Sequence, residues 1–260
     1  MSYKNILVNR DRNICTVTVN RPSKLNALNI ETIAELSAAL KAADADPKVR
    51  VVILSGAGDK AFVAGADVSE FASFSKQKGR ELSATGHREL FDMIPRMGTP
   101  VIAAINGYAL GGGLELAMSC HIRIASENAV MGLPETGLGV IPGYGGTQRL
   151  PKLVGKGPAF EIILSAKKID ANEALRIGLI NRVMPQDRLT EACTDLAKRI
   201  AVNSPTAVAA AIRAVNSDED AAEEGANVEI EAFASCFDSE DFKEGTSAFL
   251  EKRKPKFALE

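Results

Sequence analysis

A buried, strand-like run followed by a glycine turn occurs twice early in this sequence, and this recurrence limits what the chain can fold into. The apolar run 49–54 ends in a Ser-Gly-Ala-Gly turn. The run 101–105 ends in Asn106-Gly107, ahead of a helix that we expect to begin near Gly112. A third run, 121–125, has the composition of another strand. Because strands that alternate with helices assemble into layered sheets, the pattern predicts an α/β fold.

The N-terminal segment adds a hairpin and a helix to this core. The runs 6–8 and 14–19 are rich in β-branched residues and are separated by a polar turn, which predicts a β-hairpin. Asn29 precedes apolar residues at helical spacing, and Asp46-Pro47 follows them. This arrangement predicts a helix capped at Asn29 and stopped before Pro47.

The C-terminal third is mainly helical in pattern. Helices are expected over residues 159–164, 171–177, 189–202, 206–215 and 223–237. Since no linker divides the chain, we expect one α/β core over residues 1–195 followed by a helical region over 196–260. That region could cover the core or present an apolar face to another subunit.

Charge and apolar patterning narrow the classes of function. Lys and Arg total 31 against 33 for Asp and Glu, so the formal net charge of −2 argues against broad binding of nucleic acid. The cationic segment 251–256 is interpreted as a solvated helix end in preference to a phosphate contact. No apolar stretch approaches the ~20 residues of a membrane span, and residues 1–10 lack a signal-peptide pattern. We expect a cytoplasmic protein with no membrane partner, or a mature organellar protein without its presequence.

Cysteine and histidine usage predicts no metal site. The four cysteines are far apart and form no C-x-x-C pair, so free and mostly buried thiols are expected, at Cys15, Cys120, Cys193 and Cys236. Only His87 and His121 are present, and neither belongs to a metal-binding or hydrolase pattern. Both histidines are predicted to be structural or to lie at the surface.

Two glutamates in apolar, glycine-rich surroundings are the strongest candidates for chemistry. Glu115 follows the triplet Gly111-Gly112-Gly113, and Glu135 lies 20 residues later in a Gly/Pro-rich stretch. A carboxylate costs free energy to bury, so two of them near tight turns indicate acid/base chemistry. Glu115 could alternatively stabilise its helix through the helix dipole, because it lies in the first turn.

Two glycine-rich turns are candidates for binding an oxyanion. The triplet 111–113 opens a helix, where backbone N–H groups lack intrahelical partners and negative charge is favoured. A lone glycine triplet more commonly serves to let the helix pack closely against the sheet. The segment 60–68 could supply a second N–H donor. Taken alone, it is better explained as a strand-to-helix turn capped by Asp67 or Ser69.

Several longer motifs occur in a fixed order along the chain. They are Asn20-Arg21-Pro22 with Asn26-Ala27-Leu28, Ala64-Gly65-Ala66-Asp67, the run 100–115, Pro134-Glu135, and the run 139–150 ending in Gly-Gly-Thr-Gln-Arg-Leu. In this combination the chain resembles the crotonase (enoyl-CoA hydratase/isomerase) superfamily over nearly its whole length. The resemblance implies a spiral of repeated β-β-α units with C-terminal helices that drive assembly into a homotrimer or a homohexamer.

The resemblance also implies an acyl-CoA substrate, no metal and no cofactor beyond the coenzyme A that the substrate carries. It places the thioester oxygen on the backbone N–H groups of Ala66 and Gly112, and the reacting water between Glu115 and Glu135. Further substrate contacts are implied around the nucleotide, the acyl chain and a C-terminal helix, at Lys24, Leu25, Ala64, Asp67, Val68, Phe249 and Lys252.

Acids at both glutamate positions are typical of the hydratases of this superfamily, whereas its isomerases and dehalogenases usually replace at least one. We therefore expect reversible syn hydration of a trans-2-enoyl-CoA, with one glutamate as base and the other as acid. A Δ3,Δ2-enoyl-CoA isomerase is the nearest alternative. An RNA-binding protein of the same fold is an alternative of another class, which the charge balance does not favour.

Overall fold

The computed structural model describes residues 3–216, 230–231, 233–234 and 236–255. Its main sheet has six strands in the order β1-β2-β3-β5-β7-β10 among these residues. The strands are β1 (Ile6–Asp11), β2 (Ile14–Val19), β3 (Val51–Gly56), β5 (Val101–Ile105), β7 (Ile122–Ser126) and β10 (Arg182–Met184). β1 and β2 form the predicted antiparallel hairpin, and every other neighbouring pair is parallel.

A smaller sheet follows the order β4-β6-β8-β9. Its strands are three residues long: β4 (Ala61–Val63), β6 (Tyr108–Leu110), β8 (Val130–Gly132) and β9 (Lys168–Asp170). β4, β6 and β8 are mutually parallel, whereas β9 is antiparallel to β8. Each of β3, β5 and β7 is followed by a strand of this sheet and then by a helix or helical turn. The repeated β-β-α unit implied by the resemblance is therefore confirmed.

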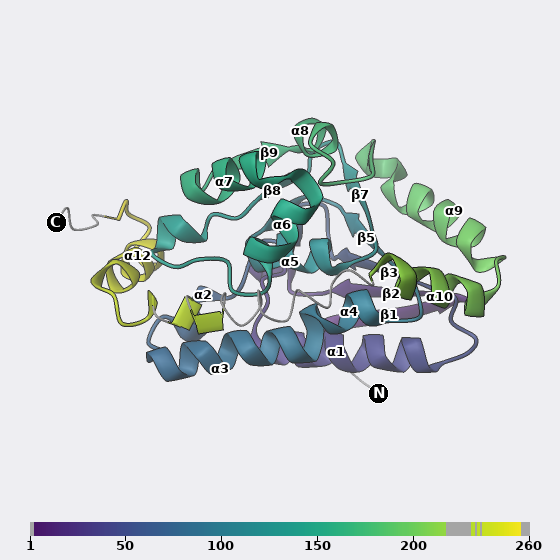
Figure 1. Ribbon diagram of the computed structural model, residues 1–260, viewed down its shortest axis with the longest axis horizontal. Helices are drawn as coiled ribbons and strands as arrows, with labels where there is room; N and C mark the ends of the chain where they lie inside the picture. The colour runs from purple at the N-terminus through teal and green to yellow at the C-terminus, as the bar shows by residue number, and fades with distance from the viewer. Residues whose placement is uncertain (1–2, 217–229, 232, 235, 256–260) are drawn as a thin grey trace.

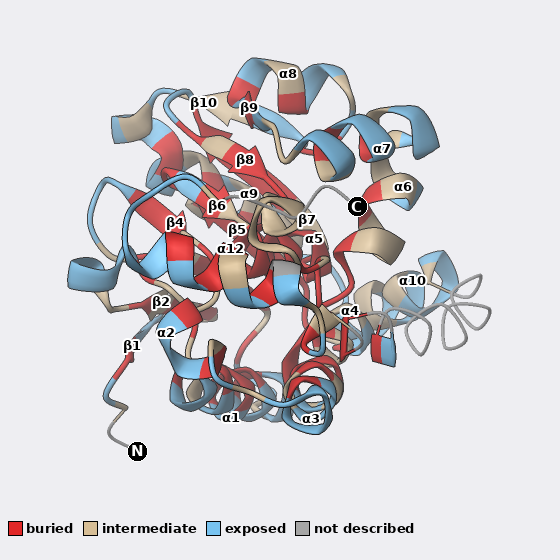
Figure 2. Ribbon diagram, turned by 90° about the vertical axis from the view of Figure 1, so that its left-hand side faces the viewer, coloured by how far each residue is buried: buried red, intermediate tan, exposed pale blue. Residues whose placement is uncertain are grey.

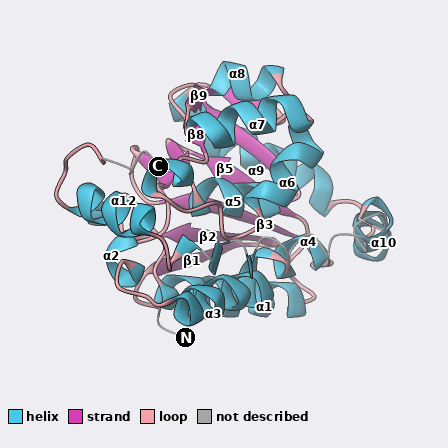
Figure 3. Ribbon diagram, turned by 60° about the vertical axis from the view of Figure 1, so that its left-hand side comes forward, coloured by secondary structure: helices cyan, strands magenta, loops and turns pink. Residues whose placement is uncertain are grey.

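Helices surround the two sheets (Figures 1 and 3). The α-helices are α1 (Ile30–Ala45), α2 (Val68–Phe71), α3 (Lys76–Gly86), α4 (Met93–Arg96), α5 (Gly112–Ser119), α6 (Gly146–Val154), α7 (Lys156–Ser165), α8 (Ala171–Arg176), α9 (Leu189–Ala201), α10 (Pro205–Val215) and α12 (Glu240–Leu250). Shorter turns are η1 (Pro22–Lys24), the π-helical η2 (His87–Phe91), η3 (Glu135–Leu138) and η4 (Gln186–Arg188). Asn29 caps α1 as predicted, because its side chain accepts a hydrogen bond from the Thr32 N–H. Among the described residues, no helix has the length and apolar character needed to cross a membrane.

The two faces of the main sheet are buried in two separate cores. Successive residues of a strand point to opposite faces, so in β3 the side chains of Val52 and Leu54 pack with those of α1, while Val51 and Ile53 pack with those of α9. Burial is accordingly concentrated in the strands and in the inward faces of the helices (Figure 2). The sheet is thus held between helical layers, and its central strands are held firmly in place.

Some predicted boundaries differ from the structure. β3 begins two residues later than the run 49–54, because Val49 and Arg50 precede the first ladder pair of that strand. The division between residues 195 and 196 falls inside α9, which is continuous. Of the helix predicted over 223–237, residues 223–229, 232 and 235 lie outside the described residues. The segment 60–68, interpreted as a turn, contains β4.

The close approach of α5 to β4 depends on a glycine. A Cβ atom on Gly113 would lie 1.9 Å from the Val63 carbonyl oxygen. We expect Gly113→Ala to lower the free energy of unfolding by at least about 2 kcal/mol, because the helix would have to move off the strand. Gly157→Ala is the matched control, since that helical glycine has open space around its Cβ position and should change stability by less than about 1 kcal/mol. Equal urea midpoints for the two variants would contradict the packing argument.

Candidate active site

A cavity of about 370 Å³ opens where the small sheet, the start of α5 and the C-terminal helix α12 meet. α12 lies beside α2 in both Figure 1 and Figure 3. The residues predicted from sequence that line this cavity are Ala64, Ala66, Val68, Gly112, Glu115, Glu135 and Phe249. Residues far apart in the sequence are thereby brought to one place, including both glutamates.

Glu115 lies in the first turn of α5 and is almost completely buried, with 1% of its surface exposed. Its Oε1 atom accepts hydrogen bonds from the Tyr144 and Gly146 backbone N–H groups, each at 2.8 Å. The turn between these donors passes through Gly145, whose φ of +97° favours glycine. Hydrogen bonds from the main chain therefore compensate the burial of this carboxylate.

Glu135 begins the helical turn η3, directly after Pro134. Its Oε2 atom is buried. A Cβ atom on Gly111 would lie 2.7 Å from Glu135 Oε1, and Gly111 has a φ of +50°. Glycine is required at position 111 both by the backbone conformation and by the proximity of the carboxylate.

The two candidate oxyanion donors are neighbours in space. A Cβ atom on Gly112 would lie 3.7 Å from the Ala66 amide nitrogen. Gly112 is the first residue of α5, so its N–H has no acceptor within the helix. Among the described residues, no protein group accepts a hydrogen bond from the Ala66 N–H, although the nearby Ala64 and Asp67 amides donate to the Leu25 and Leu28 carbonyls. The cavity therefore has two neighbouring residues with candidate amide donors, Ala66 and Gly112, and two glutamates.

Asp67 supports the Ala66 segment and does not line the cavity. Its carboxylate pairs with the Arg21 guanidinium at 3.0 Å and accepts a hydrogen bond from the Ser69 hydroxyl at 2.6 Å. Although Asp67 is at the N-cap position of α2, its side chain makes no capping hydrogen bond. Burial raises the pKa of Asp67, but Ser69 and Arg21 outweigh that effect, and the pKa falls below its usual value.

The other three predicted contacts also lie outside the residues that line the cavity. Leu25 has a φ of +49°, and its carbonyl accepts the Ala64 N–H at 3.0 Å. Lys24 ends the turn η1 beside it, and Lys252 follows α12. Contact of Lys24, Leu25, Asp67 and Lys252 with substrate stays a prediction.

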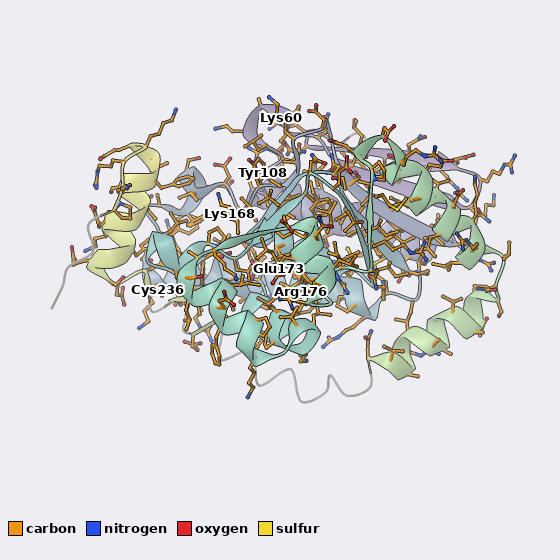
Figure 4. All side chains as sticks on the ribbon, turned by 90° about the horizontal axis from the view of Figure 1, so that it is seen from above. Lys60, Tyr108, Lys168, Glu173, Arg176 and Cys236 are labelled. Atoms are coloured by element: carbon orange, nitrogen blue, oxygen red, sulfur yellow. The ribbon has the colours of Figure 1, made fainter. Side chains whose placement is uncertain are left out.

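Several residues of the cavity were not predicted from sequence. Its apolar wall includes Phe71, Leu82 and Tyr144. The Tyr144 ring stacks on Phe91 with centroids 4.5 Å apart, and burial together with the Glu115 charge raises the pKa of its hydroxyl. Lys168, labelled in Figure 4, adds a cation at the start of β9. The glycines around Tyr144 in the motif 143–146 could have pointed to that residue, whereas no local sequence pattern pointed to Phe71, Leu82 or Lys168.

The remaining titratable residues do not suggest a metal site. Within the described ranges, no group of three or more His, Cys, Asp or Glu side chains could hold a metal ion. His87 is buried and contacts Asp92 at 3.1 Å, whereas His121 accepts the Val101 N–H at 3.0 Å. Both histidines have structural contacts, as predicted. Cys15, Cys120 and Cys193 are buried free thiols, and Cys236 is half-buried.

The chain is similar to known proteins over nearly its whole length. A family model described as Enoyl-CoA hydratase/isomerase matches residues 9–259. The chain is 46% identical to a crotonyl-CoA hydratase of Syntrophomonas wolfei, with 99% of each chain covered. It is also 46% identical to a short-chain-enoyl-CoA hydratase of Clostridium acetobutylicum, over 98% of this chain and 97% of the relative.

Solved structures give the same result. An enoyl-CoA hydratase from Bacillus anthracis matches with a TM-score of 0.79 at 40% identity, over 98% of this chain and 99% of the other. A carnitinyl-CoA hydratase from Mycobacterium avium matches with a TM-score of 0.87 at 37% identity, over the same shares of the two chains. The spiral fold is that of a crotonase-type protein. The chain belongs to the enoyl-CoA hydratase/isomerase family.

The ion pair between Asp67 and Arg21 yields a stability prediction. We expect Asp67→Asn to lower the free energy of unfolding by about 2 kcal/mol at pH 7, because a charged hydrogen-bonded partner of Arg21 is lost. Since the pKa of Asp67 is lower in the folded state, this contribution is present above the unfolded pKa of about 3.9 and is lost as the pH falls through the folded value. Urea unfolding at pH 7 and at pH 3 measures both effects. A loss that stayed constant down to pH 3 would argue against the ion pair as its cause.

Proposed function

We propose that this protein catalyses the reversible syn addition of water to a trans-2-enoyl-CoA, giving a 3-hydroxyacyl-CoA. One observation carries the proposal: two carboxylates, Glu115 and Glu135, border the same cavity as two adjacent backbone amides. The relatives named crotonyl-CoA hydratase and short-chain-enoyl-CoA hydratase support a short substrate such as crotonyl-CoA.

The amides of Ala66 and Gly112 bind the thioester oxygen in this mechanism. Attack of water at the β-carbon moves negative charge onto that oxygen, and two preorganised N–H donors stabilise the resulting enolate. Gly112 also begins α5, so the helix dipole favours the same charge. The loss of one such donor typically costs about 2.7–4 kcal/mol of transition-state stabilisation.

The two glutamates hold the water and carry out the two proton transfers. One, as a carboxylate, removes a proton from the water as the oxygen adds to the β-carbon, and the other, which starts protonated, delivers its proton to the α-carbon on the same face. Glu115 is oriented by Tyr144 and Gly146, whereas Glu135 lies beside Gly111 on the turn η3. Two differently supported acids can thus perform different proton transfers around one water.

Assembly and location are proposed on more limited grounds. Large apolar side chains are exposed on α7, directly after α9 and at the C-terminal end of α10, namely Phe160 at 60%, Leu164 at 71%, Val202 at 83% and Val215 at 82%. Such surfaces favour burial against other copies of the chain, which supports a homotrimer or homohexamer. The bacterial origin of the relatives supports a cytoplasmic location.

We predict that Glu115→Gln and Glu135→Gln each lower kcat for crotonyl-CoA hydration by at least about a hundredfold, as removal of a general acid or base does. The amide keeps the size of the side chain, so circular dichroism and thermal unfolding should match the wild type closely. Asp170→Asn, in a helix cap outside the residues that line the cavity, is the control and should keep its activity. Near-wild-type hydration by either glutamine variant would rule out the two-acid mechanism.

A second assay separates hydration from isomerisation. We expect the wild type to hydrate crotonyl-CoA faster than it converts a 3-enoyl-CoA into the 2-enoyl isomer. Isomerisation needs a carboxylate to move one proton but needs no bound water, so the ratio of the two rates reports the reaction class. An isomerisation rate well above the hydration rate would favour the isomerase alternative.

A further inference from the structure

The peptide between Gly143 and Tyr144 is fixed from both sides. Its N–H donates to Glu115 Oε1 at 2.8 Å, and its carbonyl accepts a hydrogen bond from the Ser83 hydroxyl at 2.6 Å. The N–H and C=O of a planar trans peptide point in opposite directions. Ser83, on α3, therefore sets the direction in which the Tyr144 N–H points.

The next peptide is held by Arg149. Its guanidinium donates to the Tyr144 carbonyl at 2.6 Å and to the Phe91 carbonyl at 2.9 Å. The Tyr144 carbonyl lies in the chain between the two amides that bind Glu115, those of Tyr144 and Gly146. Arg149 thus holds the segment that connects both donors.

Asp92 holds Arg149 in turn, through an ion pair of 2.5 Å in which the guanidinium side chain is only 15% exposed. Burial raises the pKa of Asp92. The hydrogen bond with His87 and the charge of Arg149 lower it by more than burial raises it, so the pKa lies below its usual value. The carboxylate is therefore ionised at neutral pH and keeps the guanidinium in place.

Neither Ser83 nor Arg149 lines the cavity that contains Glu115. Ser83 is completely buried, and Arg149 borders a separate cleft of about 750 Å³. The contact that each side chain makes toward Glu115 is through a backbone carbonyl of the segment 143–146. Ser83 and Arg149 donate hydrogen bonds to backbone carbonyls of this segment, and backbone N–H groups of the same segment donate to Glu115.

We propose that Ser83 and Arg149 are positioning residues that hold the Glu115 carboxylate at its reacting geometry. The inference rests on the proposed hydration reaction. Misplacement of a reacting group by about 1 Å can cost about a hundredfold in rate, so loss of one of the two supports should cost a substantial part of kcat. The proposed thioester donors, Ala66 and Gly112, lie on other segments, so KM should change less than kcat.

The test compares Ser83→Ala with Ser37→Ala. Ser37 is an equally suitable buried serine, because its hydroxyl also donates to a distant backbone carbonyl, that of Glu89, at 2.6 Å. Both variants should lose similar thermal stability. We expect kcat for crotonyl-CoA to fall about tenfold in Ser83→Ala, with KM within twofold of the wild type, and to stay unchanged in Ser37→Ala. Equal kcat values for the two variants would overturn the proposal.

Arg149→Lys gives a second, independent comparison. Lysine keeps the charge but cannot bond the Tyr144 carbonyl and Asp92 in the same fork geometry, so kcat should again fall while KM is retained. Arg10→Lys is its control, because Arg10 likewise joins a carboxylate, Asp46, to a backbone carbonyl, that of Arg12. The rates are normalised to the concentration of folded protein. A wild-type kcat in Arg149→Lys would contradict the positioning role of Arg149.

A double variant tests whether Ser83 acts through Glu115. If it does, adding Ser83→Ala to Glu115→Gln should change the residual hydration rate by less than twofold, because no reacting carboxylate is left to position. A further tenfold loss would show an independent effect and overturn the proposal. Failure of the wild type to hydrate any enoyl-CoA would instead refute the proposed function, so the two failures are distinguishable.

Discussion

The buried carboxylate of Glu115 is the interaction on which the rest of the site depends. A carboxyl group with almost no exposed surface is stable only when hydrogen bonds replace its lost hydration. The Tyr144 and Gly146 amides supply them. This requirement joins α5 to the segment that begins α6, and it explains why that segment is rich in glycine.

The small sheet brings the other groups to the same place. β4, β6 and β8 are neighbouring parallel strands, and Ala66, Gly112 and Glu135 each follow the carboxyl end of one of them. The ends of parallel strands share one edge of a sheet, where ligands commonly bind. One copy of the β-β-α unit thus supplies one donor, the next supplies a donor together with Glu115, and the third supplies the second acid.

Much of this arrangement could be predicted from sequence, and the reasons differ between residues. The strand 101–105 was predictable because its apolar run is continuous, and Glu115 and Glu135 stood out in apolar motifs. The strands of the small sheet were missed because three residues are too few to show a period of two. Tyr144 and Gly146 as donors to Glu115, and Ser83 as a support, were missed because these contacts join residues 29 to 60 positions apart. Arg149 lies only five positions from Tyr144, but its other contacts, to Phe91 and Asp92, join residues 58 and 57 positions apart. No local pattern records such pairs.

In the proposed mechanism, two amides and two glutamates act on one thioester and one water. A crystal structure with 3-hydroxybutyryl-CoA bound would test this arrangement. We expect the thioester oxygen within about 3 Å of both the Ala66 and Gly112 nitrogens, with the 3-hydroxyl between Glu115 and Glu135. A thioester oxygen bound elsewhere, or a hydroxyl in contact with only one glutamate, would contradict it.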